Sequence, residues 1–403
     1  MTRRVAITGI GLVTALGVTR EETWRGLVSG TCGIRPLTVF DAAGYRSRVA
    51  AEVSMPDIDA QLTPLERRRW SRGDQFGVVA AREAVADAEL PGTVDPVRVG
   101  VLLGAGTSDL LRNEDYHRTA LLRGIRYARP SHAWNHFSST PVDIIASSFG
   151  FEGMRSCVVA ACSSSTIAIG QAADAIRAGR LDAALTGGTD ALARLTFSGF
   201  NALKLMDQDP CRPFDRGRAG MNIGKGAAIM VLEEMERARR RGARIYAELA
   251  GFGFGCEAFH PTAPEPDGKP VAAIVARAVR DARLSPADVD HVNAHGTATA
   301  QNDRAEARGF RDVFGERVGE VPVTSLKSML GHCLGAAGGI EAAVLALTVA
   351  RGVIPPTINH SETDPDCSLD VVANQAREAR VRCGISTSLG FGGNDSALVL
   401  TAI

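Results

Sequence analysis

Short apolar runs rich in β-branched residues alternate along the chain with alanine-rich stretches of helical periodicity. Strands that alternate with helices at this spacing form largely parallel sheets with helices packed on their faces, so the pattern predicts an α/β protein. The predicted strands are Val5–Thr8, Val99–Leu103, Ser156–Ala160, Ala183–Thr186, His291–Ala294 and Val321–Ser325, and the predicted helices are Glu21–Gly26, Thr166–Ala178, Val271–Ala282, Arg304–Phe310 and Gly335–Ala350.

Two of these strand-to-helix segments have the same design. Cys157–Ala161 leads through Cys162 into a helix with one apolar face, and Val321–Ser325 leads through His332 into another, about 170 residues further along. Each segment is a strand, a turn of small or reactive residues, and a helix packed by glycine and alanine. The repeat predicts a duplicated fold.

The two copies are expected to pack as one body, because no low-complexity linker divides the chain. The seam is placed in Glu248–Gly255, which gives one half at residues 1–252 and another at residues 253–403. The helix Gly335–Ala346 is so rich in small residues that another backbone is expected to approach it closely.

Composition excludes several classes of protein. The 403 residues carry 45 Lys+Arg against 45 Asp+Glu, and this formal charge of zero disfavours a nucleic-acid binder held by bulk positive charge. The eight cysteines form no C-x-x-C pair, which disfavours a disulfide framework or a metal module, and no uninterrupted apolar run is long enough to span a membrane. We therefore expect a soluble protein of a reducing compartment, the cytoplasm.

Cys162 is the first candidate for chemistry. It stands between a strand and a helix, where unpaired N–H groups and the positive end of the helix dipole favour a thiolate and can also hold an oxyanion. A buried structural cysteine followed by capping serines is the alternative interpretation. His295 and His332 each follow a predicted strand, the place where sites of α/β folds gather, although each alone is equally compatible with an ordinary loop histidine.

Three further residues have both a structural and a functional interpretation. Glu341 lies on an apolar helix and needs a buried cation; Lys327, one of four lysines in the chain, is the available one, with a surface position as the alternative. Phe391, in the glycine-rich stretch Gly390–Asp395, is either a lid over a pocket or a plug in the core.

Together these motifs resemble the β-ketoacyl-acyl-carrier-protein synthases, the ketosynthases of the thiolase superfamily, and most closely the elongating type of fatty-acid and type II polyketide synthesis. The resemblance implies a thiolase-like duplicated fold, layered α-β-α-β-α with two central mixed sheets. It covers nearly the whole chain, through Val5–Gly17, Ala160–Ser165, Arg212–Asp215, Asn293–Asp303, Ser325–Gly339 and Gly390–Asn394.

By this resemblance, Cys162 is the acylated nucleophile and His295 and His332 are the pair that supports decarboxylation. The N–H groups of Cys162 and Phe391 form the oxyanion hole. The remaining implied roles are the supporting pair Lys327 and Glu341, the gate Phe391, and the pantetheine contacts Thr297 and Thr299, with Thr107 in a loop near the acyl pocket.

The implied reaction is a decarboxylative Claisen condensation. An acyl group moves to Cys162, malonyl-acyl carrier protein loses CO₂, and its carbanion attacks the thioester to give a β-ketoacyl product. No metal or redox cofactor is implied, since the substrates are carried on the phosphopantetheine of the carrier. Two histidines favour this class over initiating ketosynthases, which resemble a Cys-His-Asn arrangement, and over thiolases, whose second cysteine is absent from Gly390–Asp395.

Two kinds of partner follow from the resemblance. Arg68 and Arg69 belong to a basic cluster that corresponds to a docking region for the acidic carrier protein; a solvated charged face is the alternative. The family also implies a homodimer, or a heterodimer with a chain-length-factor homologue. A catalytically silent subunit of that kind is the rival function, although such subunits usually lack the nucleophile that is present here as Cys162.

Several residues depart from the family pattern. Lys225 stands where glutamate is usual, so a compensating carboxylate is expected nearby if Lys225 is buried. Asn394-Asp395 replaces Thr-Asn, and Leu389 replaces a frequent phenylalanine. These changes favour a specialised ketosynthase, of a polyketide or polyene pathway, over a housekeeping enzyme.

Overall fold

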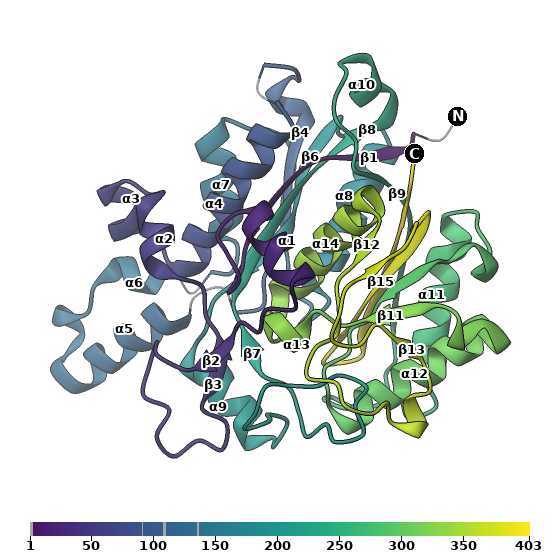
Figure 1. Cartoon of the computed structure of the whole chain (residues 1–403). Helices are drawn as coiled ribbons and strands as arrows, with labels where there is room; N and C mark the ends of the chain where they lie inside the picture. Colours follow the sequence, from purple (N-terminus) through teal and green to yellow (C-terminus); the bar gives the residue numbers. More distant parts are fainter. Residues whose placement is uncertain (1–2, 91, 108–109, 135–136) are drawn as a thin grey trace.

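The computed structural model describes residues 3–90, 92–107, 110–134 and 137–403 and is built on one large mixed sheet (Figure 1). Eleven strands follow the order β13-β11-β10-β15-β16-β9-β1-β8-β6-β4-β5. The strands are β1 (Val5–Val13), β2 (Ile34–Pro36), β3 (Val49–Ala51), β4 (Val99–Gly104), β5 (Arg155–Val158), β6 (Ala183–Asp190), β7 (Ile223–Gly224), β8 (Gly226–Glu234), β9 (Ala247–Cys256), β10 (His291–Asn293), β11 (Pro322–Thr324), β12 (Val353–Ile354), β13 (Asp370–Val371), β14 (Arg377–Glu378), β15 (Cys383–Gly390) and β16 (Asn394–Thr401).

The large sheet contains the same arrangement of strands twice. The orders β1-β8-β6-β4-β5 and β9-β16-β15-β10-β11 match position by position, with two antiparallel pairings followed by two parallel ones in each. The two groups meet where β1 pairs with β9 over only two residue pairs. The two expected mixed sheets are therefore present and are joined along this short edge.

The expected seam lies in β9. A division between residues 252 and 253 cuts this strand, yet β9 pairs with β16 along almost its whole length. We therefore propose that the second half begins before Ala247.

Helices cover both outer faces and fill the space between the two groups of strands. Figure 1 shows α8 and α14 in the middle, α4 and α7 on one side, and α11 and α12 on the other. This is the expected five-layer arrangement. The helices are α1 (Arg20–Val28), α2 (Met55–Ala60), α3 (Pro64–Arg69), α4 (Arg72–Asp87), α5 (Leu110–Arg123), α6 (Pro130–Trp134), α7 (Thr140–Phe149), α8 (Ser164–Arg177), α9 (Arg194–Ala202), α10 (Met235–Arg240), α11 (Lys269–Asp281), α12 (Ala300–Phe314), α13 (Lys327–Leu330) and α14 (Ala337–Arg351).

Strand β1 runs five residues beyond its predicted end at Thr8, through two glycines. A methyl group at Gly9 would overlap the Ala84 carbonyl oxygen, and one at Gly11 would overlap that of Ala80. The glycines therefore mark the close packing of α4 on the sheet rather than the end of a strand.

The central helices approach their neighbours as closely as their small residues suggested. A methyl group at Gly335 would overlap the backbone of Gly106, and one at Gly338 would overlap the Thr166 hydroxyl of α8. The window Leu334–Arg351 is long and apolar enough to cross a membrane, but 83% of it is buried inside the protein. It is the core helix that joins the two halves.

The contact between β4 and α8 gives the first prediction. A side chain at Gly104 would overlap the Ser165 backbone nitrogen, so Gly104→Ala must push α8 away from the sheet. We expect a loss of about 2 kcal/mol in the free energy of unfolding, measured by urea titration. Gly319→Ala, at a glycine with nothing within 4 Å of the added methyl, is the matched control and should change little. Equal stability of both variants would contradict this packing argument.

Candidate active site

A sharp turn presents Cys162 at the beginning of α8. Ala161, directly before it, has a left-handed backbone (φ +48°), which costs an alanine on the order of 1 kcal/mol and persists only where its surroundings impose it. Ser164 supports the turn, because its hydroxyl donates to the Ala161 carbonyl at 2.6 Å and accepts from the Ala160 N–H at 2.9 Å. The Ser163 hydroxyl donates to the Ser388 carbonyl at 2.9 Å, which fastens the turn to the second half of the protein.

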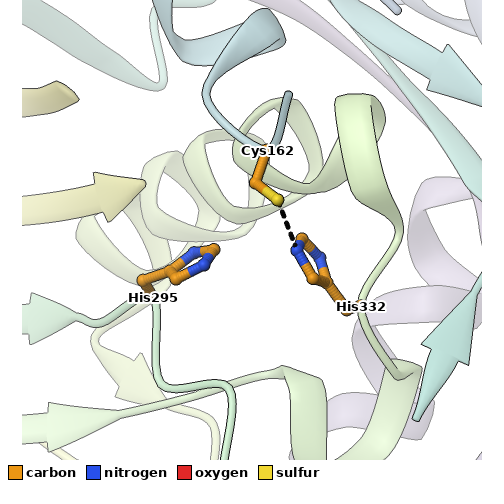
Figure 2. Close-up of side chains that lie close together, drawn as sticks. All are labelled: Cys162, His295 and His332. Carbon is orange, nitrogen blue, oxygen red and sulfur yellow. Dashed lines mark hydrogen bonds between the residues drawn. The ribbon is translucent and has the colours of Figure 1, made fainter. Parts of the chain in front are cut away.

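His332 lies against Cys162 across the boundary between the halves. Its Nε2 is 2.9 Å from the Cys162 Sγ (Figure 2), and its Nδ1 accepts the Leu334 N–H at 3.2 Å. Because Nδ1 is an acceptor, the proton of the neutral ring resides on Nε2 and points at the sulfur. The backbone of His332 is held by its own N–H, which donates to the Asn222 carbonyl at 2.7 Å.

His295 is held by a buried carboxylate. Glu306 accepts the N–H groups of His295 and Gly296, each at 2.7 Å, and the Thr387 hydroxyl at 2.7 Å. Burial raises the pKa of Glu306 to about 7, against the lowering effect of these donors. The Glu306 carboxylate thus fixes the turn that carries His295 through two backbone N–H groups.

The two imidazoles stand nearly at right angles beside the nucleophile (Figure 2). The ring centroids of His295 and His332 are 5.2 Å apart, with an angle of 85° between the planes. Burial, reinforced by the nearby charge of Lys327, lowers the pKa of both rings well below the ordinary value. Both histidines are therefore neutral near pH 7 and offer N–H donors without a positive charge.

Burial also dominates the thiol. It raises the pKa of Cys162 to about 12, although Lys327 and the N–H of Phe391 lower it. Burial therefore opposes the thiolate that the helix N-terminus and Lys327 favour. The desolvation cost of a buried anion exceeds the stabilisation by the surrounding dipoles and charge.

The same three side chains also form a potential metal-ligand set. One donor atom from each of Cys162, His295 and His332 lies within 4.8 Å of the others, and sulfur with two imidazoles is a combination that zinc takes. The hydrogen bond from Leu334 argues against this use, because it leaves His332 with a proton rather than a lone pair at Nε2. The geometry favours a centre that donates hydrogen bonds.

Lys327 and Glu341 form an ion pair beneath the site, as the sequence suggested. The Lys327 Nζ contacts the Glu341 Oε1, and the two residues are only 1% and 2% exposed. Burial raises the pKa of Glu341, and Lys327 opposes that rise. The pair keeps a positive charge close to both histidines.

A narrow cavity of about 60 Å³ opens onto the three reactive side chains. Thr297 and Thr299 lie in its wall with their hydroxyl oxygens 2.9 Å apart, and Leu389 also lines it. Phe391 contributes to the same wall, and its ring centroid is 5.4 Å from that of Phe200. These residues surround the route by which a substrate must reach Cys162.

Besides Lys327 and Glu341, three predicted site residues are not part of this wall. The Thr107 hydroxyl donates to Asp190 at 3.1 Å, beside the N–H groups of Gly106 and Gly335 that donate to the same carboxylate. Arg68 and Arg69 are exposed on the short helix α3, away from the cavity lining. Their roles in binding substrate and carrier remain predictions.

Two of the departures from the family pattern are buried ionisable residues. Lys225 is 1% exposed, with its Nζ 5.8 Å from the centroid of the Phe76 ring. Asp395 is also 1% exposed and lies in the cavity wall beside Glu257. Neither substitution is a change of surface charge.

Sequence reasoning missed two buried carboxylates that shape the site. Glu306 holds His295, and Asp190 ties the Gly106–Thr107 turn to Gly335, shortly after His332. Both act on backbone N–H groups rather than on a recognisable side-chain motif. The one signal in the sequence was an acidic residue among positions that were otherwise expected to be buried.

The Lys327–Glu341 pair leads to the second prediction. Lys327→Met should lower the free energy of unfolding by about 3 kcal/mol or more, because it leaves the Glu341 carboxylate buried without its cation. Adding Glu341→Leu should recover most of that loss. Denaturant unfolding of both single variants and the double variant measures the coupling, and strictly additive losses would refute it.

Comparison with known proteins agrees with this geometry. The profile of the β-ketoacyl synthase N-terminal domain matches residues 2–238, and that of the C-terminal domain matches residues 246–361. The tetracenomycin polyketide synthase ketoacyl synthase alpha subunit of Streptomyces glaucescens is 40% identical over 99% of this chain and 97% of its own. The 3-oxoacyl-[acyl-carrier-protein] synthase 2 of Synechocystis is 38% identical over 98% and 97%. The solved structure of the ishigamide ketosynthase/chain length factor superposes with a TM-score of 0.95, 37% identity and full coverage of both chains. The chain therefore belongs to the β-ketoacyl synthase family of condensing enzymes.

Proposed function

We propose that the protein condenses an acyl group held on Cys162 with malonyl-acyl carrier protein, releasing CO₂ and a β-ketoacyl-acyl carrier protein. The observation that carries this proposal is the placement of two neutral imidazoles beside one buried thiol at the end of a cavity. Such donors suit a reaction that develops negative charge on oxygen.

The first step is acyl transfer. The Cys162 sulfur attacks the carrier thioester carbon, the N–H groups of Cys162 and Phe391 hold the oxyanion, and the carrier's sulfur leaves. The Cys162 proton ends on that departing thiol, so the step is balanced without a permanent base. This transfer of the proton suits a thiol whose pKa is raised by burial, because no free thiolate has to accumulate.

The second step uses the histidines. When malonyl carrier protein occupies the cavity, its carboxylate leaves as CO₂ and the thioester oxygen becomes an enolate, which the N–H groups of His295 and His332 stabilise. The carbanion attacks the carbonyl carbon of the Cys162 thioester, the carbon–sulfur bond breaks, and the Cys162 thiolate takes up a proton from solvent to restore the thiol. Because the His332 Nε2–H already points at this sulfur, it can donate to it as negative charge returns.

Access to the cavity requires motion. A space of about 60 Å³ holds a few water molecules rather than an extended acyl chain with its pantetheine. We infer that Phe391, packed on Phe200, moves aside when the acyl chain enters. Thr297 and Thr299 are placed to contact the pantetheine arm.

The proposed partners are an acyl carrier protein and a second ketosynthase-type subunit. The names of the Synechocystis and ishigamide relatives include a carrier-linked substrate and a chain length factor, respectively. Arg68 and Arg69, exposed and basic, are proposed to dock the acidic carrier, and Thr107 is proposed to act near the acyl chain. We place the reaction in the cytoplasm, in polyketide, polyene or fatty-acid synthesis, with no cofactor beyond the carrier's own arm.

A silent subunit is the competing function, and acylation tests between the two. We expect that incubation with acyl carrier proteins adds one acyl group to the protein, located on Cys162 by mass spectrometry of intact protein and peptides. Cys162→Ala should abolish this adduct, whereas Cys157→Ala, at a cysteine outside the cavity lining, should retain it. No adduct with any chain length would favour the silent role.

Decarboxylation is expected to depend on the two histidines. Replacing His295 or His332 by Ala should leave most of the acylation intact but slow release of CO₂ from malonyl carrier protein by at least about 100-fold, since each removes one oxyanion donor. Radiolabelled malonyl substrate measures the release. Normal CO₂ production in both variants would overturn the assigned roles.

A further inference from the structure

A second acidic pair lies in the wall of the active-site cavity, apart from the residues used above. Asp395, near the start of β16, is 1% exposed, and its Oδ2 accepts no hydrogen bond from the described residues. Glu257, just after β9, lines the same cavity. A buried carboxylate oxygen that accepts no hydrogen bond, in a wall that contains a second carboxylate, is unfavourable unless the group carries a proton.

Glu257 already uses one oxygen as an acceptor. Its Oε2 accepts the Glu265 N–H at 2.9 Å, and its own N–H donates to the Gly393 carbonyl at 2.9 Å. The Gly392 N–H donates to the Pro261 carbonyl at 2.8 Å. The segment 257–265 is therefore attached by two hydrogen bonds to the Gly390–Gly393 turn that carries Phe391.

We propose that Asp395 and Glu257 share one proton, with the Asp395 carboxyl donating to the Glu257 carboxylate, and that this bond holds the Phe391 turn in place. Asp395 is then a positioning residue, acting through the backbone whose Phe391 N–H faces the Cys162 sulfur. The proposal deepens the proposed function, because it explains how that oxyanion donor is kept aligned.

The charges around Asp395 favour the protonated form. Burial comes first, followed by Glu257 and, from α12, Glu306, and together they raise the pKa of Asp395 to about 9, while the Gly390 N–H lowers it. The other titratable groups in the same cavity wall are His260, His295, His332 and Cys162. The cavity wall contains no lysine or arginine among the described residues, so a proton is the counterion at hand.

Linkage gives a test that does not depend on catalysis. The folded protein keeps a proton on Asp395 that the unfolded chain releases above about pH 4, so the contribution of this group to stability falls as pH rises from about 4 to about 9. Asp395→Asn keeps a neutral donor and has no such loss. The Tm of this variant relative to the natural protein should therefore increase with pH across that window and level off above it.

A second measurement detects the proton directly. Infrared difference spectra between pH 8.5 and pH 10.5, above the pKa of about 7 of Glu306, should show loss of a protonated carboxyl band in the natural protein. Asp395→Asn and Glu257→Gln should both remove that change. Glu265→Gln, in the same segment but contributing only its backbone N–H to Glu257, should preserve it. Invariant Tm differences together with an unchanged band in Asp395→Asn would overturn the proposal.

Activity provides the last readout. Above about pH 9 the rate of Cys162 acylation by the natural protein, divided by that of Asp395→Asn, should fall about tenfold per pH unit, because two carboxylates then repel across the turn. Thioester hydrolysis and the titration of Cys162 affect both proteins equally, so they cancel in this ratio of rates. A constant ratio despite the infrared change would refute the positioning role, whereas no acylation in either protein would instead refute the proposed function.

Discussion

The site depends on how closely the two halves approach each other. Cys162 comes from one half and both histidines come from the other, so no side chain of the trio is positioned by local structure alone. Backbone meets backbone at Gly335 and Gly106, and the Ser163 hydroxyl reaches the Ser388 carbonyl. Since packed interiors transmit small shifts rather than absorbing them, this contact fixes the 2.9 Å separation between thiol and imidazole.

Burial then sets the chemistry. The same exclusion of water that raises the pKa of Cys162 lowers those of His295 and His332, so all three groups are uncharged at rest. Fixed N–H donors in such surroundings stabilise a developing oxyanion more strongly than they would in water. Buried carboxylates hold the turns that aim these donors, and they are tolerated because backbone N–H groups satisfy them.

Sequence reasoning located the reactive residues because each follows a strand, and sheet topology brings strand ends together. It could not locate Glu306, since that carboxylate acts on N–H groups eleven and ten residues away and leaves no motif. The sequence analysis ended the first strand at Thr8, directly before Gly9. The missing side chain of Gly9 is what allows α4 to pack closely against β1. Sequence reasoning could not weigh the thiolate favoured at Cys162 against burial, because a helix terminus is visible in a sequence whereas the depth of burial is not.

The departures from the family pattern are best understood as buried electrostatics. Lys225 and Asp395 both place an ionisable group where water is excluded. Such a group is tolerated only where neighbouring groups compensate the cost of burying it. Asparagine at position 395 would offer its hydrogen bond at any pH, whereas aspartate offers one only while it is protonated. If the proton is shared with Glu257, the substitution preserves the contact at neutral pH but makes it depend on the protonation of Asp395. Asp395 then breaks the rule that ionisable groups stay out of buried positions. Proteins break such rules mainly at functional sites, and this residue lies in the cavity wall.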